Sequence, residues 1–210
     1  TKEIEAIELD FLREDLPKLL DSMQLGADRI TQIVNSLRNF SRLDEAEFKA
    51  VDIHKGIDST LVILANKLKS KKQKTDIEVI KEYQDLPLVE CYPNQLNQVF
   101  MNIMSNAIDA LEESEKENLQ IRIATQIEQN NLVIISISDN ASGINQDTIE
   151  NIFNPFFTTK PIGKGTGLGL SISYQIITEK HKGMISCNST IGEGTEFLIT
   201  IPIEQEVDNG

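Results

Sequence analysis

Three groups of polar or small residues in this chain have types and spacings suited to chemistry. In the first, Asn102, Asn106 and Asp109 stand at i, i+4 and i+7, which puts them on one side of a helix. Asn is a poor residue for a helix interior, so two of them in an otherwise apolar helix indicate a role. Carboxamide oxygens are ligands that Mg²⁺ accepts together with water and phosphate oxygens. The alternative is that both Asn side chains simply face solvent.

The second group follows an apolar segment that is typical of a strand, residues 132–138. Asp139 comes directly after it and begins a tight polar turn that ends with Gly143 and Ile144. A sheltered Asp at the end of a strand can accept a hydrogen bond from an exocyclic amine such as that of adenine. This turn is therefore a candidate for base recognition.

The third group is a glycine-rich segment, in which four of the eleven glycines fall within seven residues, at positions 163, 165, 167 and 169. Glycines let backbone N–H groups approach phosphate oxygens, and the N-terminus of the helix that follows favours anions. Lys160 and Lys164 could neutralise phosphate charge, although loop lysines are more often only solvated. The segment is not a Walker loop, because no Gly-Lys-Ser/Thr closes it. Taken alone, it could equally be a linker.

An α+β fold would bring these groups together. Helical spacing of apolar residues predicts helices over residues 52–68, 94–113 and 167–180. Runs rich in Ile and Val predict strands over residues 76–83, 88–91, 120–127, 132–138, 184–189 and 196–202. This order of elements predicts a two-layer α/β sandwich, with helices on one face of a mixed sheet.

Ahead of this domain, apolar residues at helical spacing run from Ile4 to Phe40. They predict a long helix preceded by a shorter one, with a break near Asp15 because Pro17 fits a first helical turn. A helix with such a stripe must bury it against other helices, so we expect half of a dimeric bundle. An ordinary helical subdomain is the alternative.

Charge and cysteine content exclude several classes of protein. The formal net charge is −13 and the isoelectric point is about 4.6, whereas binding to nucleic acid or anionic lipid needs clustered Lys and Arg. Cys91 and Cys187 have no metal-binding or disulfide-framework spacing, which favours a reducing, cytoplasmic compartment. The sequence has no apolar run of membrane-spanning length, so we expect no membrane contact by this chain, although a parent protein could be membrane-attached.

The order of the motifs is more specific than any one of them. Together they resemble the N, G1, F, G2 and G3 boxes of sensor histidine kinases, whose wider group contains gyrase, the Hsp90 chaperones and MutL. The resemblance covers about residues 52–203 and implies the Bergerat ATP-binding fold. In order, the matching motifs are Asn102 with Asn106, Asp139 to Gly143, Phe153-Asn154-Pro155-Phe156, Gly165-Thr166-Gly167-Leu168-Gly169 and Gly192-Glu193-Gly194-Thr195.

The resemblance implies a site for ATP and Mg²⁺. Asp139 would bind the adenine amine with Thr195 beside it, and Asn106 would coordinate Mg²⁺ with Asn102 nearby. Asn102 and Lys160 would take part in the reaction, and the glycine-rich segment would form a flexible lid over the triphosphate. The implied nucleotide-binding residues are Asn106, Asp109, Asp139, Gly143, Ile144, Lys164, Gly165, Thr166, Gly167, Leu168, Gly169 and Thr195.

Two aromatic residues and one alanine complete this comparison with the family. Phe153 and Phe156 would anchor the lid by packing. Ala141 stands where the first glycine of the G1 motif is usual, which is a departure from the pattern. A methyl group there would narrow the nucleotide pocket, or would be tolerated if the backbone φ is negative.

The residue one helical turn before the Mg²⁺ ligand favours phosphoryl transfer over hydrolysis. Hydrolytic members of the group carry a Glu there, which activates water, whereas the amide of Asn102 cannot act as a general base. Two alternatives are a hydrolytic ATPase of the same fold and a non-enzymatic nucleotide-binding scaffold, which Ala141 would favour. A serine-directed kinase of related fold is a weaker possibility.

Residues 28–42 resemble the second dimerisation helix of a sensor histidine kinase and the linker that follows it. We therefore divide the chain into a helical dimerisation segment (1–46), a linker (47–53), a catalytic ATP-binding domain (54–205) and a tail (206–210). This division implies a homodimer formed through the N-terminal helices.

The phosphoacceptor histidine of that family is missing from its usual place, because no His precedes His54. We expect structural roles for His54 and His181. The chain starts at Thr1 within a helical pattern, so we expect an acceptor upstream of it. The phosphate would then pass to an Asp of a response-regulator receiver domain.

Overall fold

The structure is a computed structural model that describes residues 15–24, 26–27, 30–31, 48–69, 76–128, 131–161 and 165–204. The chain divides into two compact units, which are described separately. The larger consists of Leu43–Phe157 with Gly167–Gly210, and the smaller of Thr1–Arg42 with Thr158–Thr166. The domain boundaries expected at residues 46 and 54 stay predictions.

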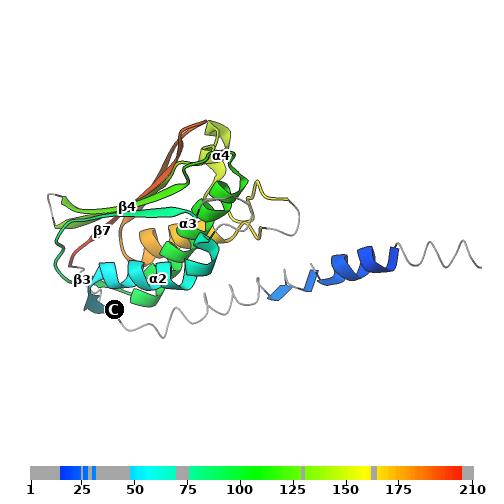
Figure 1. Ribbon diagram of the computed structural model, residues 1–210. Coiled ribbons are helices and arrows are strands. Elements are labelled where there is room, and N and C mark those ends of the chain that lie inside the picture. The colour runs from blue at the N-terminus through cyan, green and yellow to red at the C-terminus, as the bar shows by residue number, and fades with distance from the viewer. Residues whose placement is uncertain are drawn as a thin grey trace, which may run out of the picture. The chain divides into compact units, whose positions relative to one another are not determined.

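The larger unit is built on a five-stranded mixed sheet (Figure 1), as predicted. The strand order is β2-β4-β5-β7-β6, in which β2 runs parallel to β4 and every other neighbouring pair is antiparallel. The strands are β2 (Glu78–Tyr83), β4 (Gln120–Glu128), β5 (Leu132–Asp139), β6 (Met184–Thr190) and β7 (Gly194–Pro202).

The strands form because one face of each is apolar. In β5, Val133, Ile135 and Ile137 are buried, whereas the residues between them point to the other side of the sheet. Across the strand pair they oppose buried residues of β7, namely Ile201, Ile199 and Phe197. With this register, one face of the sheet is buried in the core. The register also determines which side chains at the strand ends face the helices.

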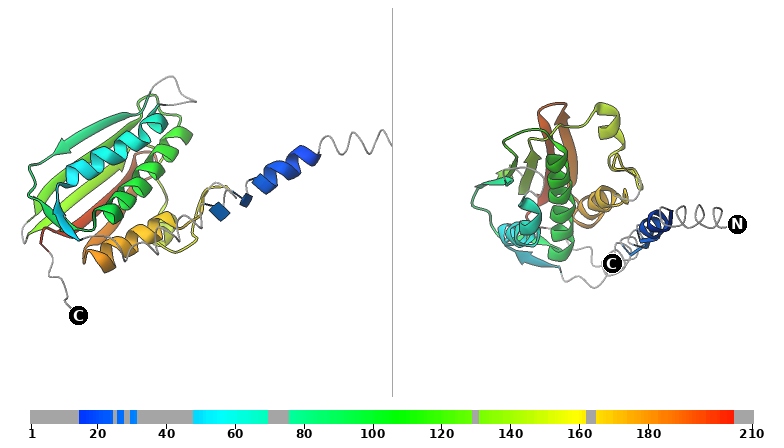
Figure 2. Two further views of the ribbon diagram at one scale, coloured as in Figure 1. Left: turned by 90° about the horizontal axis from the view of Figure 1, so that it is seen from below. Right: turned by 45° about the vertical axis from the view of Figure 1, so that its right-hand side comes forward.

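Helices of the larger unit cover that apolar face (Figure 1 and Figure 2). α2 (Ile53–Leu68), α3 (Pro93–Glu113) and α5 (Gly169–Gln175) lie side by side across the sheet (Figure 2). The predicted stripe of α3 is confirmed, since Val99, Ile103 and Ala107 are all buried. Asp52 caps α2 by accepting a hydrogen bond from His54 N at 3.0 Å, and Pro93 occupies the first turn of α3.

Three elements of the larger unit differ from the sequence prediction. β1 (Lys49–Val51) pairs antiparallel with β3 (Val89–Cys91), and α4 (Gln146–Asn151) is capped by Asn145. The last predicted helix begins at Gly169 rather than at residue 167, and its final turn is a π-helix, η2 (Ile176–Lys180). β1 and α4 are short, and neither has a stripe long enough to be read as a helix or strand of its own.

In the smaller unit, residues 15–24 are helical. The apolar side chains of this helix are between 53% and 70% exposed, and they are Leu16, Leu19, Leu20 and Met23. Residues 4–14, 25, 28–29 and 32–40 of the predicted N-terminal helices lie outside the described residues, so the predicted break near Asp15 stays a prediction. None of the helices in the described ranges is long and apolar enough to cross a lipid bilayer.

Candidate nucleotide site

Asp139 closes β5 and pairs with Thr195 at the start of β7. Its carboxylate is half-buried and accepts a hydrogen bond from Ala141 N at 2.9 Å. Burial raises the pKa of Asp139, while hydrogen bonds from the Ala141 and Thr195 backbones and the charge of Lys116 act in the opposite direction. A partly desolvated carboxylate at a strand end is a strong acceptor for a ligand N–H group.

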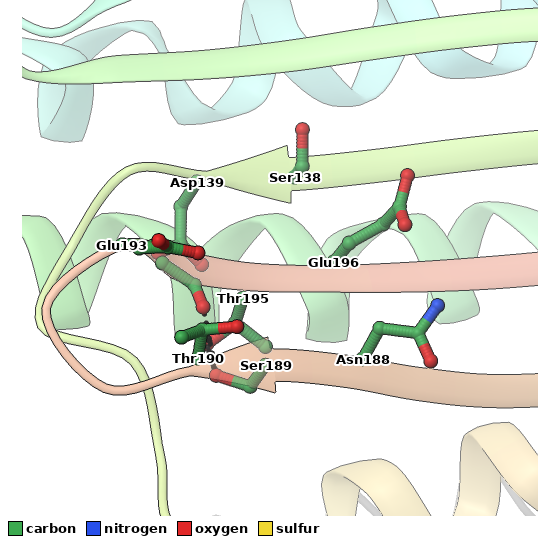
Figure 3. A pocket seen from close by; sticks show the side chains of 9 residues that line it. Ser138, Asp139, Asn188, Ser189, Thr190, Glu193, Thr195 and Glu196 are labelled. Carbon is green, nitrogen blue, oxygen red and sulfur yellow. Dashed lines mark hydrogen bonds between the residues drawn. The ribbon is translucent and has the colours of Figure 1, made fainter.

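Asp139, Thr195 and Ser189 form a row across three neighbouring strands. Because side chains alternate along a strand, these residues face the same side as the core residues Ile137 and Phe197. Figure 3 shows the row at the strand ends, within a hollow of about 270 Å³. The hollow is also lined by residues of the opposite sheet face, Ser138, Asn188 and Glu196, so only part of it belongs to the helix-side site.

Ser189 holds this row together, and no local sequence pattern selects it. Its Oγ donates to Gly194 O at 2.7 Å and accepts from Ile144 N at 2.9 Å. It also lies 3.0 Å from Thr195 Oγ1. Only the register of the β6–β7 hairpin, which pairs Ser189 with Thr195, identifies it.

The turn after β5 requires glycine at one position and accepts alanine at another. Gly143 has φ +68°, and a Cβ atom there would lie 2.2 Å from Thr190 O. Ala141 is fully buried but is not among the residues with positive φ. Its methyl group therefore fits without backbone strain. Of the two alternatives predicted for Ala141, this is the one in which the methyl group is tolerated.

Asn102 joins α3 to the start of α5. Its Nδ2 donates to Gly169 O at 2.9 Å and to Ser173 Oγ at 3.1 Å. A carbonyl oxygen can only accept a hydrogen bond, so Gly169 O must face the NH₂ group of Asn102. This contact sets the orientation of the amide, whose other polar atom is Oδ1. The structure thus brings Asn102 and Gly169 together, and Asn102 fixes the helix that follows the glycine-rich segment.

Asn106 and Asp109 lie one and two turns further along α3, and both are half-buried. Within the described residues, no group of three or more His, Cys, Asp and Glu side chains could hold a metal ion. The oxygen-bearing side chains on this side of α3 are the amides of Asn102 and Asn106 and the carboxylate of Asp109, a set that suits Mg²⁺ when phosphate and water supply its remaining ligands. The residues present therefore fit a magnesium ion that arrives with a nucleotide.

Gly167 and Leu168 lead into α5. Gly167 has φ +66°, its carbonyl accepts from Phe156 N at 2.8 Å, and a Cβ atom on it would lie 2.3 Å from Phe156 C. Phe153 packs against Tyr174 of α5 with ring centroids 5.4 Å apart, and its role as an anchor of the glycine-rich segment stays a prediction. Phe156 differs from the prediction, because its side chain is 71% exposed and its contact with Gly167 is made through the backbone.

Lys160, Gly165 and Thr166 belong to the smaller unit. Within it, Lys160 N donates to Thr158 Oγ1 at 3.2 Å, and a Cβ atom on Gly165 would lie 2.6 Å from the same oxygen. Lys164 lies outside the described residues. The roles of these four residues in a nucleotide site stay predictions.

Both histidines are engaged in structural contacts, as expected. His181 is fully buried, donates from Nδ1 to Ile176 O at 2.8 Å and accepts from Tyr92 N at 3.1 Å on Nε2. Its pKa is lowered because burial disfavours the charged ring. His54 stacks on Tyr83 with ring centroids 4.3 Å apart, and its Nε2 lies 2.8 Å from Thr125 Oγ1.

Comparison with known sequences identifies the class of protein that has this fold and the Asp139 carboxylate at the end of β5. Residues 91–205 match the model of the histidine kinase-, DNA gyrase B- and HSP90-like ATPases, and the chain belongs to this family. Within the family, its domain is the catalytic ATPase domain of a sensor histidine kinase, as the following relatives indicate.

The chain is 41% identical to sporulation kinase E of Bacillus subtilis over 59% of its own length and 16% of that protein. The catalytic domain of the histidine kinase ThkA has a TM-score of 0.62 and 32% identity, over 75% of this chain and 96% of that one. The structure of ThkA in complex with the response regulator TrrA has a TM-score of 0.66 and 28% identity. The match covers 85% of this chain and 48% of that one. The chain thus spans less than a fifth of sporulation kinase E.

Proposed function

We propose that this domain binds ATP with Mg²⁺ and donates the γ-phosphoryl group to a histidine, from which it passes to an aspartate of a response regulator. The observation that carries the proposal is the partly desolvated carboxylate of Asp139, aligned with Thr195 at the end of the sheet on the side of the helices. Family membership supports an ATP ligand.

Asp139 would select adenine over guanine. Its carboxylate, an acceptor only when ionised, would receive one N–H of the exocyclic amine of adenine. Guanine has a carbonyl oxygen at the corresponding position, and two acceptors facing each other in a half-buried site repel. Gly143, Ile144 and Thr195 would form the walls around the base.

The phosphates would lie toward α3 and the glycine-rich segment. Backbone N–H groups of Gly165, Gly167 and Gly169 would face phosphate oxygens, with Thr166 and Leu168 between them. Lys160 and Lys164 would offset the phosphate charge.

Asn106 and the Oδ1 atom of Asn102 would hold Mg²⁺, with Asp109 further along the same side of α3. The ion would supply charge neutralisation at the phosphate oxygens. Asn102 would act mainly by position, because its Nδ2 is committed to Gly169 O and Ser173 Oγ. An amide held in this way cannot take a proton from water, which supports phosphoryl transfer over hydrolysis.

The acceptor would be a histidine outside these 210 residues. The sequence contains only two histidines, and both ring nitrogens of His181 and the stacked ring of His54 are held by protein contacts. A response regulator as the next acceptor is supported by the complex of ThkA with TrrA. The exposed stripe of residues 15–24 supports a second copy of the chain as a further partner.

A transfer experiment tests the proposal. The chain is incubated with Mg²⁺, γ-labelled ATP and a separately supplied dimerisation segment that bears the acceptor histidine. We expect acid-labile label on that segment, and none when Asp139→Asn replaces the wild-type chain. Steady release of labelled phosphate without the segment would instead identify a hydrolytic ATPase, and absence of both signals would favour a non-enzymatic nucleotide-binding scaffold.

A further inference from the structure

Lys116 lies in the loop between α3 and β4, and its ammonium group contacts three backbone carbonyl oxygens. Nζ donates to Gly192 O at 2.8 Å, to Ala141 O at 3.2 Å and to Glu193 O at 3.3 Å. A lysine has three N–H donors, so these contacts use all of them.

The three carbonyls belong to two segments that frame Asp139. Ala141 is in the β5 turn (residues 139–144), and Gly192 and Glu193 are in the β6–β7 hairpin turn (residues 190–194). One backbone hydrogen bond also joins them, from Gly192 N to Ser142 O at 2.8 Å. Lys116 therefore ties the two turns to each other and to the loop after α3.

The base of the lysine is itself fixed. Lys116 N donates to Ser114 Oγ at 3.3 Å, and Ser114 is buried. The lysine thus connects the end of the helix that carries Asn102 and Asn106 with the turns at the strand ends. Displacement of the ammonium group would remove this link between the hairpin turn and the loop after α3.

The contacts lead directly to the recognition carboxylate. Ala141 uses its carbonyl to accept from Lys116 and its N–H to donate to Asp139 Oδ1. The positive charge of Lys116 also acts against the effect of burial on the pKa of Asp139, which favours the ionised, acceptor-only form. The hydrogen bonds and the charge of Lys116 therefore both act on the carboxylate of Asp139.

We infer that Lys116 is a positioning residue for adenine recognition, which orients Asp139 by clamping the β5 turn and the β6–β7 hairpin turn. The inference rests on the proposed function. It requires that loss of the clamp weakens binding of adenine nucleotides more than binding of nucleotides that lack the 6-amino group of adenine. A lysine that only stabilised the loop would weaken both equally.

The test compares Lys116→Met with Lys116→Arg and with Lys180→Met, which removes an equal charge from an exposed site. ADP and GDP are each used to displace a ribose-labelled fluorescent ATP analogue, and melting temperatures are recorded. We expect Lys116→Met to raise the Kd of ADP about tenfold, and that of GDP much less, as suits the loss of a hydrogen-bonded clamp. Lys116→Arg should recover part of the affinity, and Lys180→Met should match the wild type.

Two results would overturn the inference alone. One is an unchanged Kd of ADP in Lys116→Met, and the other is an equal rise for ADP and GDP. If Lys116→Met does not fold, the same comparison is made with Lys116→Arg, whose different donor geometry should lower the preference for ADP to a smaller extent. A wild-type chain that bound no ADP would contradict the proposed function, and the inference with it.

Discussion

Ala141 and Gly143 lie two residues apart in the β5 turn but differ in backbone conformation. Only Gly143 has positive φ, and a side chain there would collide with Thr190 O. We expect Gly143→Ala to lower the free energy of unfolding by about 2 kcal/mol or more, because φ strain and the collision add. Urea unfolding followed by circular dichroism measures the loss.

The matched control is Ala141→Gly. It removes a buried methyl group and loosens the unfolded chain, so it should lower the free energy of unfolding by about 1 kcal/mol. It should leave ATP affinity unchanged, because Ala141 already fits its backbone conformation. Tighter ATP binding in Ala141→Gly would contradict this account of the turn.

His181 gives the domain a specific dependence on pH. Its pKa in the folded state is lowered by burial, so the folded domain favours the neutral ring. The corresponding stability is present above the unfolded pKa of about 6.5 and is lost as the pH falls through the folded pKa. We expect the free energy of unfolding, measured in urea, to fall between pH 7 and pH 5 in the wild type and to fall less in His181→Gln. An identical pH profile in both proteins would contradict the assignment.

At the scale of elements, the contact between α3 and α5 depends on one amide. Asn102→Ala should lower the free energy of unfolding by about 1–2 kcal/mol through loss of its two hydrogen bonds. Asn102→Asp keeps the shape but turns a carboxylate toward Gly169 O, so it should be more destabilising than the alanine variant. Thermal melting at pH 8 ranks the two variants, and the reverse order would show that Nδ2 does not make these contacts.

The long elements of the larger unit could be predicted from sequence because each has a regular apolar pattern. The stripe of α3 and the alternation of β5 are repeated often enough to exclude other periods. β1 could not be predicted in this way, since it has three residues and pairs with the distant β3. The six residues of α4 include no buried side chain, so no pattern marks them.

In the candidate site too, some residues could be predicted from local sequence and others could not. Asp139 and Gly143 could be predicted from local residue types at a strand end. The alignment of Asp139 with Thr195 depends on sheet order, because β7 pairs with β5 although β6 precedes it in the chain. Ser189 and Lys116 could not be found from sequence, since isolated Ser and Lys residues acquire their contacts only in the folded chain.

For the whole molecule, the exposed stripe of residues 15–24 predicts self-association. An amphipathic helix with its apolar side in water is stabilised by a partner helix. We expect the chain to sediment as a dimer at micromolar concentration, and Leu19→Glu with Leu20→Glu to sediment as a monomer. Asp21→Ser, on the same helix, is the control and should remain dimeric. A monomeric wild type, or a dimeric double variant, would contradict a dimer formed through this stripe.

Recognition of ATP by Asp139 can be measured by calorimetric titration with Mg-ATP. Asp139→Asn is a suitable comparison, because burial raises the pKa of Asp139 and its ionisation therefore destabilises the folded domain at neutral pH. The variant should melt no lower than the wild type without nucleotide, so lost binding would not reflect unfolding. We predict binding of one ATP per wild-type chain and none to Asp139→Asn; equal binding by both, or binding by neither, would contradict this recognition.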